Sequence, residues 1–178
     1  MSENKGMPDG ASAILAFGDD QLKALGEMTI LFASLEDAIT KYAKALLAAF
    51  PQLVEIHKGA PAQGRPVDDL MFDGKQKLLK KLVRKLAQEH DVDATPLINA
   101  LGESKKASQD RNHAIHGWLD WDCECGNVVF RNKKGQGLPA DISEIRRLKT
   151  DLLRAFEKIV VCYDEFSKCI SHTEIEPG

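Results

Sequence analysis

The sequence is poor in aromatic residues, and it lacks both a long apolar run and an excess of charge of one sign. Phe, Trp and Tyr make up 6% of its 178 residues, which disfavours a surface that stacks the bases of single-stranded nucleic acid. The 24 Lys and Arg residues stand against 27 Asp and Glu residues, so a nucleic-acid site would have to be a local basic patch. The strongest apolar run, residues 159–163, is far shorter than the roughly 20 residues of a membrane span, and we expect no membrane partner.

The start of the chain, residues 1–10, is polar and has no cationic stretch that leads into an apolar one, so we expect no signal peptide. The four cysteines are Cys123, Cys125, Cys162 and Cys169. Reduced thiols are the ordinary state in a chain without a secretory signal, and we therefore expect a cytoplasmic protein.

The composition is that of an ordinary globular protein, with 43% apolar and 29% charged residues. A chain of this length can bury a core without support from disulfides or metals. Residues 1–18 show no sustained periodicity and predict a flexible lead-in. We expect one helical domain over residues 19–171, followed by a tail over residues 172–178.

Apolar residues that recur at three- and four-residue steps predict a long first helix, which Asp19 or Asp20 caps and which ends before Pro51. Its apolar stripe consists of Met28, Leu31, Leu35, Ala38, Tyr42, Leu46 and Ala49. The stripe is long enough to pair with another helix, in this chain or in a second copy.

Two further helices follow a possible short helix at residues 53–57 and a loop that is rich in Gly and Pro. The second main helix is predicted over residues 74–89, with Asp73 as its cap. The third begins at the pair Thr95-Pro96, which is typical of a cap and a first helical residue, and ends at Gly117.

A small β-hairpin is predicted over residues 118–137, since Val128, Val129 and Phe130 favour strands. The hairpin turn is placed at residues 125–127, and residues 131–137 are expected to be its exit loop. Asp141 and Glu144 have capping-box spacing and predict a last helix over residues 142–171. The predicted fold class is mainly α, with a hairpin insert before the last helix.

The segment Arg111-Asn112-His113-Ala114-Ile115-His116-Gly117 ends the third predicted helix. Asn112 and His116 are four residues apart and share a face, and the long side chain of Arg111 can place its guanidinium beside the His116 imidazole. The pair offers a permanent cation with bidentate phosphate geometry and a group that titrates near neutrality. Cleavage of a phosphodiester without a metal needs such an acid/base and a cation that meets the charge developing on phosphorus.

This order of Arg, a polar residue, three more residues and His on the third helix resembles the signature of the HEPN superfamily. The sequence of helices, short hairpin and long final helix resembles prokaryotic HEPN-type proteins over roughly residues 20–170. The resemblance implies an up-and-down bundle of four to five helices. It also implies a metal-independent endoribonuclease of a toxin–antitoxin or phage-defence system, acting on RNA as a homodimer in which both motifs face one cleft.

Carried over by position, the resemblance implies that Arg111 binds and polarises phosphate, that Asn112 orients the site and that His116 is the acid/base. The product would carry a 2′,3′-cyclic phosphate, because the attacking group is the substrate's own 2′-hydroxyl, and an antitoxin or other regulatory protein would control the enzyme. In HEPN toxins that a nucleotidyltransferase antitoxin silences, a nucleotide-accepting Tyr lies two residues after the motif His. This chain has Trp118 there, which has no hydroxyl to modify.

The second predicted helix has a basic face that we expect to bind RNA, although such a face can also be a plain solvated surface. This face contains no acidic residue and consists of Lys75, Lys77, Lys80, Lys81, Arg84 and Lys85. Further basic contributors are Lys105, Lys106, Arg131, Lys133 and Lys134. Trp118 and Trp121 either cover the core where hairpin and helices meet, or one of them stacks on a base.

We expect no metal and no cofactor, and two metal sites remain as alternatives. His113 and His116 could share a metal with Asp120 or Asp122. The pair of cysteines at 123 and 125 could form a zinc site with the pair at 162 and 169. The latter two, however, lie on the apolar stripe of the last helix, where Cys is typical of a small core hydrophobe.

The motif also has a purely structural interpretation. His116 can cap the last carbonyls of the helix, and Gly117 can be the residue that follows the helix end. Some HEPN domains are not catalytic, so the alternative function is a HEPN-like dimerisation or interaction module. A third possibility is a regulator that binds a metal or a nucleotide.

Overall fold

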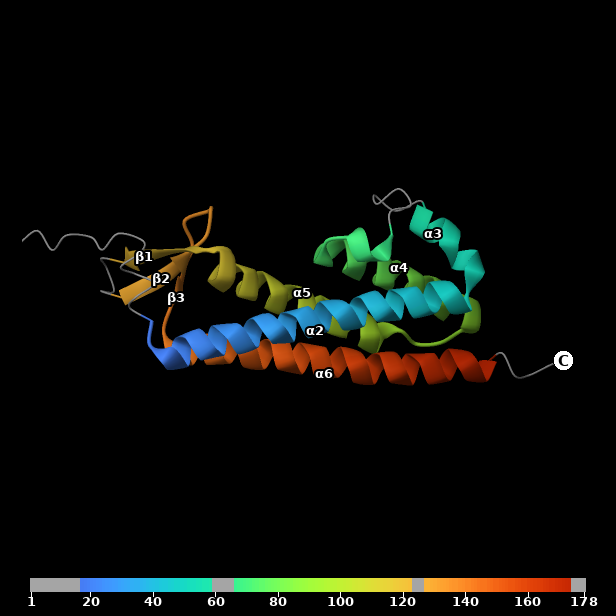
Figure 1. Cartoon of the computed structure of the whole chain (residues 1–178). Helices are drawn as coiled ribbons and strands as arrows, with labels where there is room; N and C mark the ends of the chain where they lie inside the picture. The colour runs from blue at the N-terminus through green and yellow to red at the C-terminus, as the bar shows by residue number, and fades with distance from the viewer. Residues whose placement is uncertain (1–16, 59–65, 123–126, 174–178) are drawn as a thin grey trace, which may run out of the picture. The chain divides into compact units, whose positions relative to one another are not determined.

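A computed structural model describes residues 17–58, 66–122 and 127–173 of the chain (Figure 1). Over these residues the protein is mainly α-helical, with a small antiparallel sheet before the last helix, which confirms the predicted fold class. The helices are α2 (Asp19–Ala49), α3 (Val54–Lys58), α4 (Phe72–His90), α5 (Thr95–His116) and α6 (Ile142–Thr173). Single turns of 3-10 helix lie at Pro51–Leu53 and Val67–Asp69. None of the described helices combines the length and apolar content that crossing a bilayer needs.

The chain divides into two compact units, which are described separately. Unit 1 comprises Met1–Ile30 and Ala107–Leu152, and unit 2 comprises Leu31–Lys106 and Leu153–Gly178. Most of the predicted lead-in, residues 1–16, and the end of the predicted tail, residues 174–178, lie outside the described residues.

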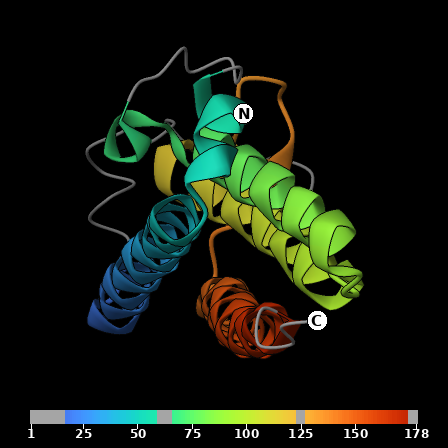
Figure 2. The same cartoon turned by 90° about the vertical axis from the view of Figure 1, so that its right-hand side faces the viewer.

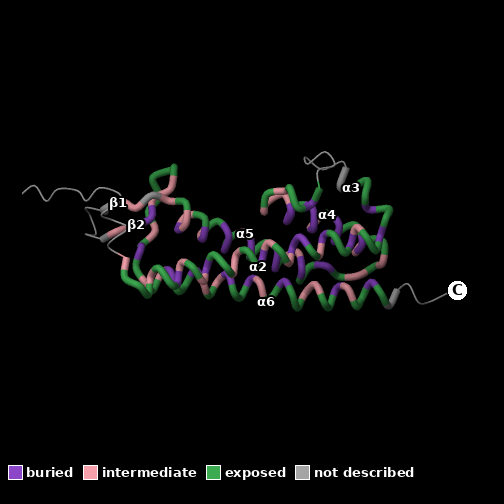
Figure 3. Tube along the Cα trace, in the orientation of Figure 1, coloured by how far each residue is buried: buried purple, intermediate pink, exposed green. Residues whose placement is uncertain are grey.

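Unit 2 is built from helices whose apolar faces form its core, and buried positions recur along each long helix (Figure 3). The first part of α5 lies beside α4 in this unit (Figure 2). The fully buried side chains include Leu35, Ile39, Leu53, Leu78, Leu79, Leu82, Leu86, Leu97, Leu101 and Ile159. The predicted stripe of the first helix is confirmed in part. Met28, Leu35 and Leu46 are buried, three further members are half-buried and Ala49 is exposed, while Ile39 and Ala43 are buried members that the stripe did not include.

Unit 1 contains the small sheet, the end of α5 and the first part of α6. Its strands are β1 (Trp118–Asp122), β2 (Asn127–Arg131) and β3 (Gly137–Pro139), in that order and all antiparallel. Phe130 on β2 is buried and pairs with Leu119 on β1 and with Leu138 on β3. Phe17 stacks on Phe130 at 5.9 Å between ring centroids, so the described end of the predicted lead-in is packed rather than loose.

The segment predicted as the exit loop of the hairpin instead forms a second turn and a third strand. Asn132 organises this turn, because its Oδ1 accepts the backbone N–H groups of Lys134 at 2.9 Å and of Gln136 at 3.1 Å. Gly135 adopts φ = 78°, a left-handed conformation that favours glycine. The turn reverses the chain within five residues and thereby allows β3 to pair with β2.

Three of the predicted helix caps are wrong, because the helices begin earlier than the acidic or hydroxyl residues suggested. Asp19 and Asp20 lie in the first turn of α2, and Asp73 lies in the first turn of α4, where negative charge still favours the helix dipole. Thr95 is the first residue of α5, and its backbone N–H donates to Asp93 Oδ1 at 2.8 Å.

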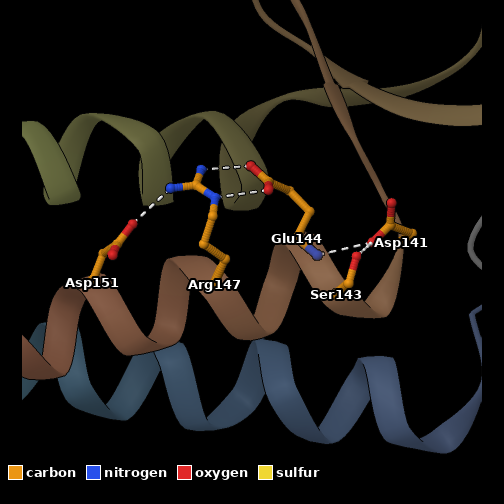
Figure 4. A network of polar contacts seen from close by, with 5 residues as sticks. All are labelled: Asp141, Ser143, Glu144, Arg147 and Asp151. Atoms are coloured by element: carbon orange, nitrogen blue, oxygen red, sulfur yellow. Dashed lines mark hydrogen bonds and ion pairs between the residues drawn. The ribbon is translucent and has the colours of Figure 1, made fainter.

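The predicted cap of the last helix is confirmed. The backbone N–H of Glu144 donates to Asp141 Oδ1 at 2.8 Å, as a capping box requires (Figure 4). Glu144 does not return the bond and instead holds both Nε and Nη2 of Arg147, whose Nη1 binds Asp151 at 2.6 Å. The helix start is therefore stabilised by a cap followed by a chain of ion pairs along the same face (Figure 4).

Candidate functional site

A pocket of about 550 Å³ in unit 1 gathers polar and basic residues, together with the acid Asp110, from the end of α5 and from the turn that follows β2. The end of α5 contributes Asn112, His113 and His116, and the turn between β2 and β3 contributes Lys133 and Lys134. Asn112 and His116 are exposed, as expected for two residues on one helix face. Two of the three predicted catalytic residues therefore line one pocket.

Arg111, the third predicted catalytic residue, does not line this pocket. It is buried, with 7% of its surface exposed, and its Nη1 donates to Asn112 Oδ1 at 2.9 Å. The guanidinium is thus joined to the residue that faces the pocket, where it can fix the side-chain amide in one orientation. In this geometry Arg111 acts on the pocket through Asn112.

His113 is a pocket residue that the sequence analysis considered only as a metal ligand. Its Nε2 lies 2.9 Å from the carbonyl oxygen of Gln136, and because a carbonyl only accepts, the ring nitrogen is the donor. This bond ties the last turn of α5 to the turn between β2 and β3. The sequence could have indicated that His113 belongs to the pocket, because it lies three residues before His116 and therefore on the same helix face.

The turn at residues 132–136 holds two lysines at the pocket. Besides the bonds of Asn132, Arg131 Nη1 donates to the carbonyl of Gly135 at 2.8 Å, and Arg131 Nε pairs with Asp120 at 2.7 Å. Lys133 and Lys134 are exposed, and neither has an acidic partner in the part of the chain that the structure describes. The pocket therefore presents two ammonium groups from a well-bonded turn beside two imidazoles, a combination suited to an anionic ligand.

Gly117 lines the pocket at the point where the chain passes from α5 into β1. It follows the end of α5 directly, as predicted, but it does not adopt a left-handed φ. A Cβ at this position would lie 2.3 Å from the carbonyl oxygen of His113 and 3.1 Å from that of Arg131. Glycine is required here because two backbone segments approach closely.

Several residues considered in the sequence lie partly or wholly outside the described part of the chain. Trp118 begins β1 and pairs with Arg131, but its side chain and that of Trp121 are not among those described, and Cys123 and Cys125 lie outside the described residues. The interpretation of the other two cysteines as core hydrophobes is wrong, because Cys162 is half-buried and Cys169 is exposed on α6. They lie beside, rather than on, the buried stripe of that helix.

The alternative of a metal shared by His113 and His116 finds no third ligand among the side chains that the structure describes, and that of Asp122 is not one of them. No group of three His, Cys, Asp or Glu side chains that could hold an ion occurs among the described residues. Asp120, which was considered as a third ligand, is the ion-pair partner of Arg131.

The basic face of α4 belongs to unit 2, and it differs from the prediction in two ways. Lys75 is buried rather than solvated, and its Nζ pairs with Glu36 of α2 at 2.7 Å. Acids do accompany this face, since Lys77 pairs with Asp73 at 2.6 Å and Lys85 with Glu89 at 3.0 Å. Both pairs are four residues apart, so they follow from the helix repeat and were visible in the sequence.

Comparison with protein-family models, with curated proteins and with solved structures finds no match to this chain.

Proposed function

We propose that this protein is a metal-independent endoribonuclease of HEPN type. The observation that carries the proposal is the unit 1 pocket, in which the exposed His116 lies on one wall with His113 and Lys133 and Lys134 contribute from the adjoining turn. An imidazole supplies the acid/base group, and ammonium groups attract and neutralise a phosphodiester. The HEPN resemblance of the segment Arg111 to Gly117 adds the substrate class, RNA.

In the proposed reaction His116 takes the proton from the ribose 2′-hydroxyl, whose oxygen attacks phosphorus. The new bond joins O2′ to phosphorus while the bond from phosphorus to O5′ breaks, and the departing O5′ takes up a proton from water. Lys133 and Lys134 stabilise the negative charge that gathers on the phosphoryl oxygens. Asn112, held by Arg111, orients the phosphate or the ribose. The products are a 2′,3′-cyclic phosphate and a 5′-hydroxyl.

The wider setting follows from the same resemblance and is part of the proposal. The enzyme acts in the cytoplasm as a homodimer, within a toxin–antitoxin or phage-defence system, under an antitoxin or other regulatory protein. Trp118 carries no hydroxyl, so nucleotide transfer to the position after the motif is not part of this control.

A second candidate function is a non-catalytic HEPN-like interaction module. The burial of Arg111 favours it, because a residue that is 7% exposed and whose guanidinium is bonded to Asn112 is not placed to clamp a phosphate directly. The two candidates differ in whether RNA is cut.

The deciding experiment incubates wild type and His116→Ala with labelled total RNA and tRNA in EDTA. The proposal expects cleavage by wild type alone, with 2′,3′-cyclic phosphate ends and unchanged thermal stability of the variant. His90, which packs edge-on against Phe50 in unit 2, offers a matched control in His90→Gln. Intact RNA with wild type would favour the interaction module. Equal cleavage by His116→Ala would overturn the role of His116, and loss of wild-type cleavage in EDTA would favour a metal enzyme.

A further inference from the structure

The contact between α4 and α5 in unit 2 is fixed by polar bonds that hold the two helices at a defined spacing. Gln76 Nε2 donates to Ser104 Oγ at 2.5 Å and to the carbonyl of Leu101 at 3.3 Å, and both Gln76 and Ser104 are buried. Lys105 Nζ pairs with Asp73 at 3.0 Å across the same seam. Side chains that flank this seam are therefore set on a rigid frame.

Three cations gather along one side of this seam. Lys80 and Arg84 are four residues apart and share a face of α4. The Lys80 side chain reaches across to α5, because its Nζ lies 3.9 Å from where a Cβ on Gly102 would be. Lys105 follows Gly102 by three residues, so it lies about one turn further along the same side of α5.

This cluster of Lys80, Arg84 and Lys105 has less negative charge beside it than the rest of the basic face. The structure pairs Lys75 with Glu36 and Lys85 with Glu89. Asp73, the carboxylate that acts on Lys80, is already shared by Lys77 and Lys105. No acidic partner of Lys80 or Arg84 occurs among the described residues. Burial and the positive charges of Arg84 and Lys105 lower the pKa of Lys80, while Asp73 opposes them, so the cations repel one another.

The surroundings of the cluster favour a nucleic acid over a protein as the occupant. Protein interfaces are rich in aromatic and apolar anchors and poor in lysine. The large apolar side chains that the structure describes as exposed lie on α2, α3 and α6 or precede α4, and none of them lies on α4 or α5. The Arg84 guanidinium can bind a phosphate with two hydrogen bonds, and the two lysines add ammonium groups that act as point charges.

We propose that Lys80, Arg84 and Lys105 form a binding site for the phosphate backbone of a nucleic-acid strand. The site belongs to unit 2 and is inferred from contacts within that unit. Its test is therefore independent of whether the unit 1 pocket cleaves RNA. From the basic face the site takes Lys80 and Arg84, which share a side of α4. It adds Lys105 of α5, whose partner Asp73 is shared with Lys77. Bound phosphate relieves the repulsion among the three cations.

The test measures binding of a labelled 2′-O-methyl RNA strand, which no 2′-hydroxyl attack can cleave, to the full chain by fluorescence anisotropy at several salt concentrations. With three phosphates neutralised, the logarithm of the binding constant should fall with the logarithm of salt with a slope of about −2. Lys80→Ala, Arg84→Ala and Lys105→Ala should each weaken binding and reduce that slope by about 0.7. Lys41→Ala, which removes an exposed and ion-paired cation of α2 in the same unit, is the control and should bind like wild type.

A conservative variant separates binding from a structural role. Lys80→Arg keeps a positive charge that does not titrate, so its affinity should match wild type near neutral pH and fall less than that of wild type at about pH 9.5. An equal loss of affinity in Lys81→Ala and Lys85→Ala would show a diffuse basic surface and overturn the site. Absence of binding by wild type would also overturn it. So would tighter binding of a poly-glutamate peptide with the same dependence on Lys80, which would identify an acidic protein as the occupant.

Discussion

The Arg111 guanidinium donates a hydrogen bond from Nη1 to the side-chain oxygen of its neighbour Asn112, at 2.9 Å. One of these residues is buried and the other lines the pocket, so a buried cation holds an exposed amide. A positioned amide loses no rotational freedom when it meets a ligand, which is how preorganised groups favour a transition state. Within the proposed reaction, Arg111 is a positioning residue, and this role can be separated from direct phosphate binding.

The substitution Arg111→Lys keeps the charge but shortens the side chain and removes the fork. We expect it to lose the bond to Asn112 and to lower the rate of RNA cleavage about tenfold, the equivalent of a hydrogen bond to a charged group. A double-mutant cycle with Asn112→Ala measures the coupling. If Arg111 acts through Asn112, the double variant is no slower than Asn112→Ala alone. Effects that multiply in the double variant would instead indicate that Arg111 binds phosphate itself.

The substitution Gly117→Ala should distort the pocket and destabilise unit 1. The added methyl would press against two backbone carbonyl oxygens, of His113 and Arg131, which cannot turn aside as flexible side chains do. We expect the free energy of unfolding to fall by about 2 kcal/mol, with loss of cleavage. Gly26→Ala is the control, because Gly26 is exposed within α2 and no atom lies within 4 Å of the added methyl. That variant should be more stable by roughly 0.5–1 kcal/mol in urea unfolding, and equal destabilisation by both would contradict the argument.

The helices could be predicted from the sequence because burial imposes a three- and four-residue period on each of them. The start of α6 could also be predicted, but those of α2 and α5 could not. There the acceptors of the first N–H groups are Gln21, whose Oε1 accepts from Gly18, and Asp93, which precedes the expected cap. The third strand was missed because Gly137–Pro139 is too short to alternate. Its existence depends on the Asn132 turn and on pairing with β2.

The part of the candidate site that lies on α5 could be predicted from the helix repeat. Asn112 and His116 face the same way because they are four residues apart. The direction of Arg111 depends on how unit 1 packs around α5, and the helix repeat does not reveal that. Lys133 and Lys134 reach the pocket only because the sheet folds back against the helix end, a contact between segments about 20 residues apart in sequence.

The cap of α6 should make stability depend on pH in the acid range. Hydrogen bonds from the Ser143 hydroxyl and the Glu144 backbone hold the pKa of Asp141 below its usual value (Figure 4). The folded protein therefore favours the carboxylate, and its stabilisation is present above about pH 4 and is lost as the pH falls through the lowered pKa. Asp141→Ala should cost about 1 kcal/mol at neutral pH, as other cap deletions do.

Asp141→Asn is the matched variant, because Asn is also a good cap but does not titrate. It should retain most of the stability at pH 7, and its advantage over Asp141→Ala should persist at an acid pH below the lowered pKa of Asp141, where the wild-type carboxyl is protonated. Urea unfolding followed by circular dichroism at both pH values measures this. A wild-type advantage over Asp141→Ala that is unchanged in acid would show that the charge of Asp141 contributes nothing.

The buried ion pair between Lys75 and Glu36 should stabilise unit 2 far more than an exposed pair of the same kind. The Lys75 side chain is 8% exposed and that of Glu36 is 31% exposed. Glu36→Gln would leave a buried ammonium without its counter-charge, and we expect a loss of about 2 kcal/mol, below the 3–5 kcal/mol typical of a fully buried pair. Asp37→Asn breaks the neighbouring pair with Lys41, whose side chains are 58% and 71% exposed, and should cost under about 0.5 kcal/mol.

The double variant Lys75→Met/Glu36→Leu shows whether the charge or the packing matters at this position. Since well-packed apolar residues can replace a buried pair without loss, it should recover the stability that Glu36→Gln loses. Urea unfolding of the three variants and wild type at neutral pH gives the comparison. If Glu36→Gln and Asp37→Asn cost the same, water reaches Lys75 in solution and the ammonium is not desolvated. If instead the double variant is as unstable as Glu36→Gln, the pair is needed for the local fit of α4 against α2 in this unit.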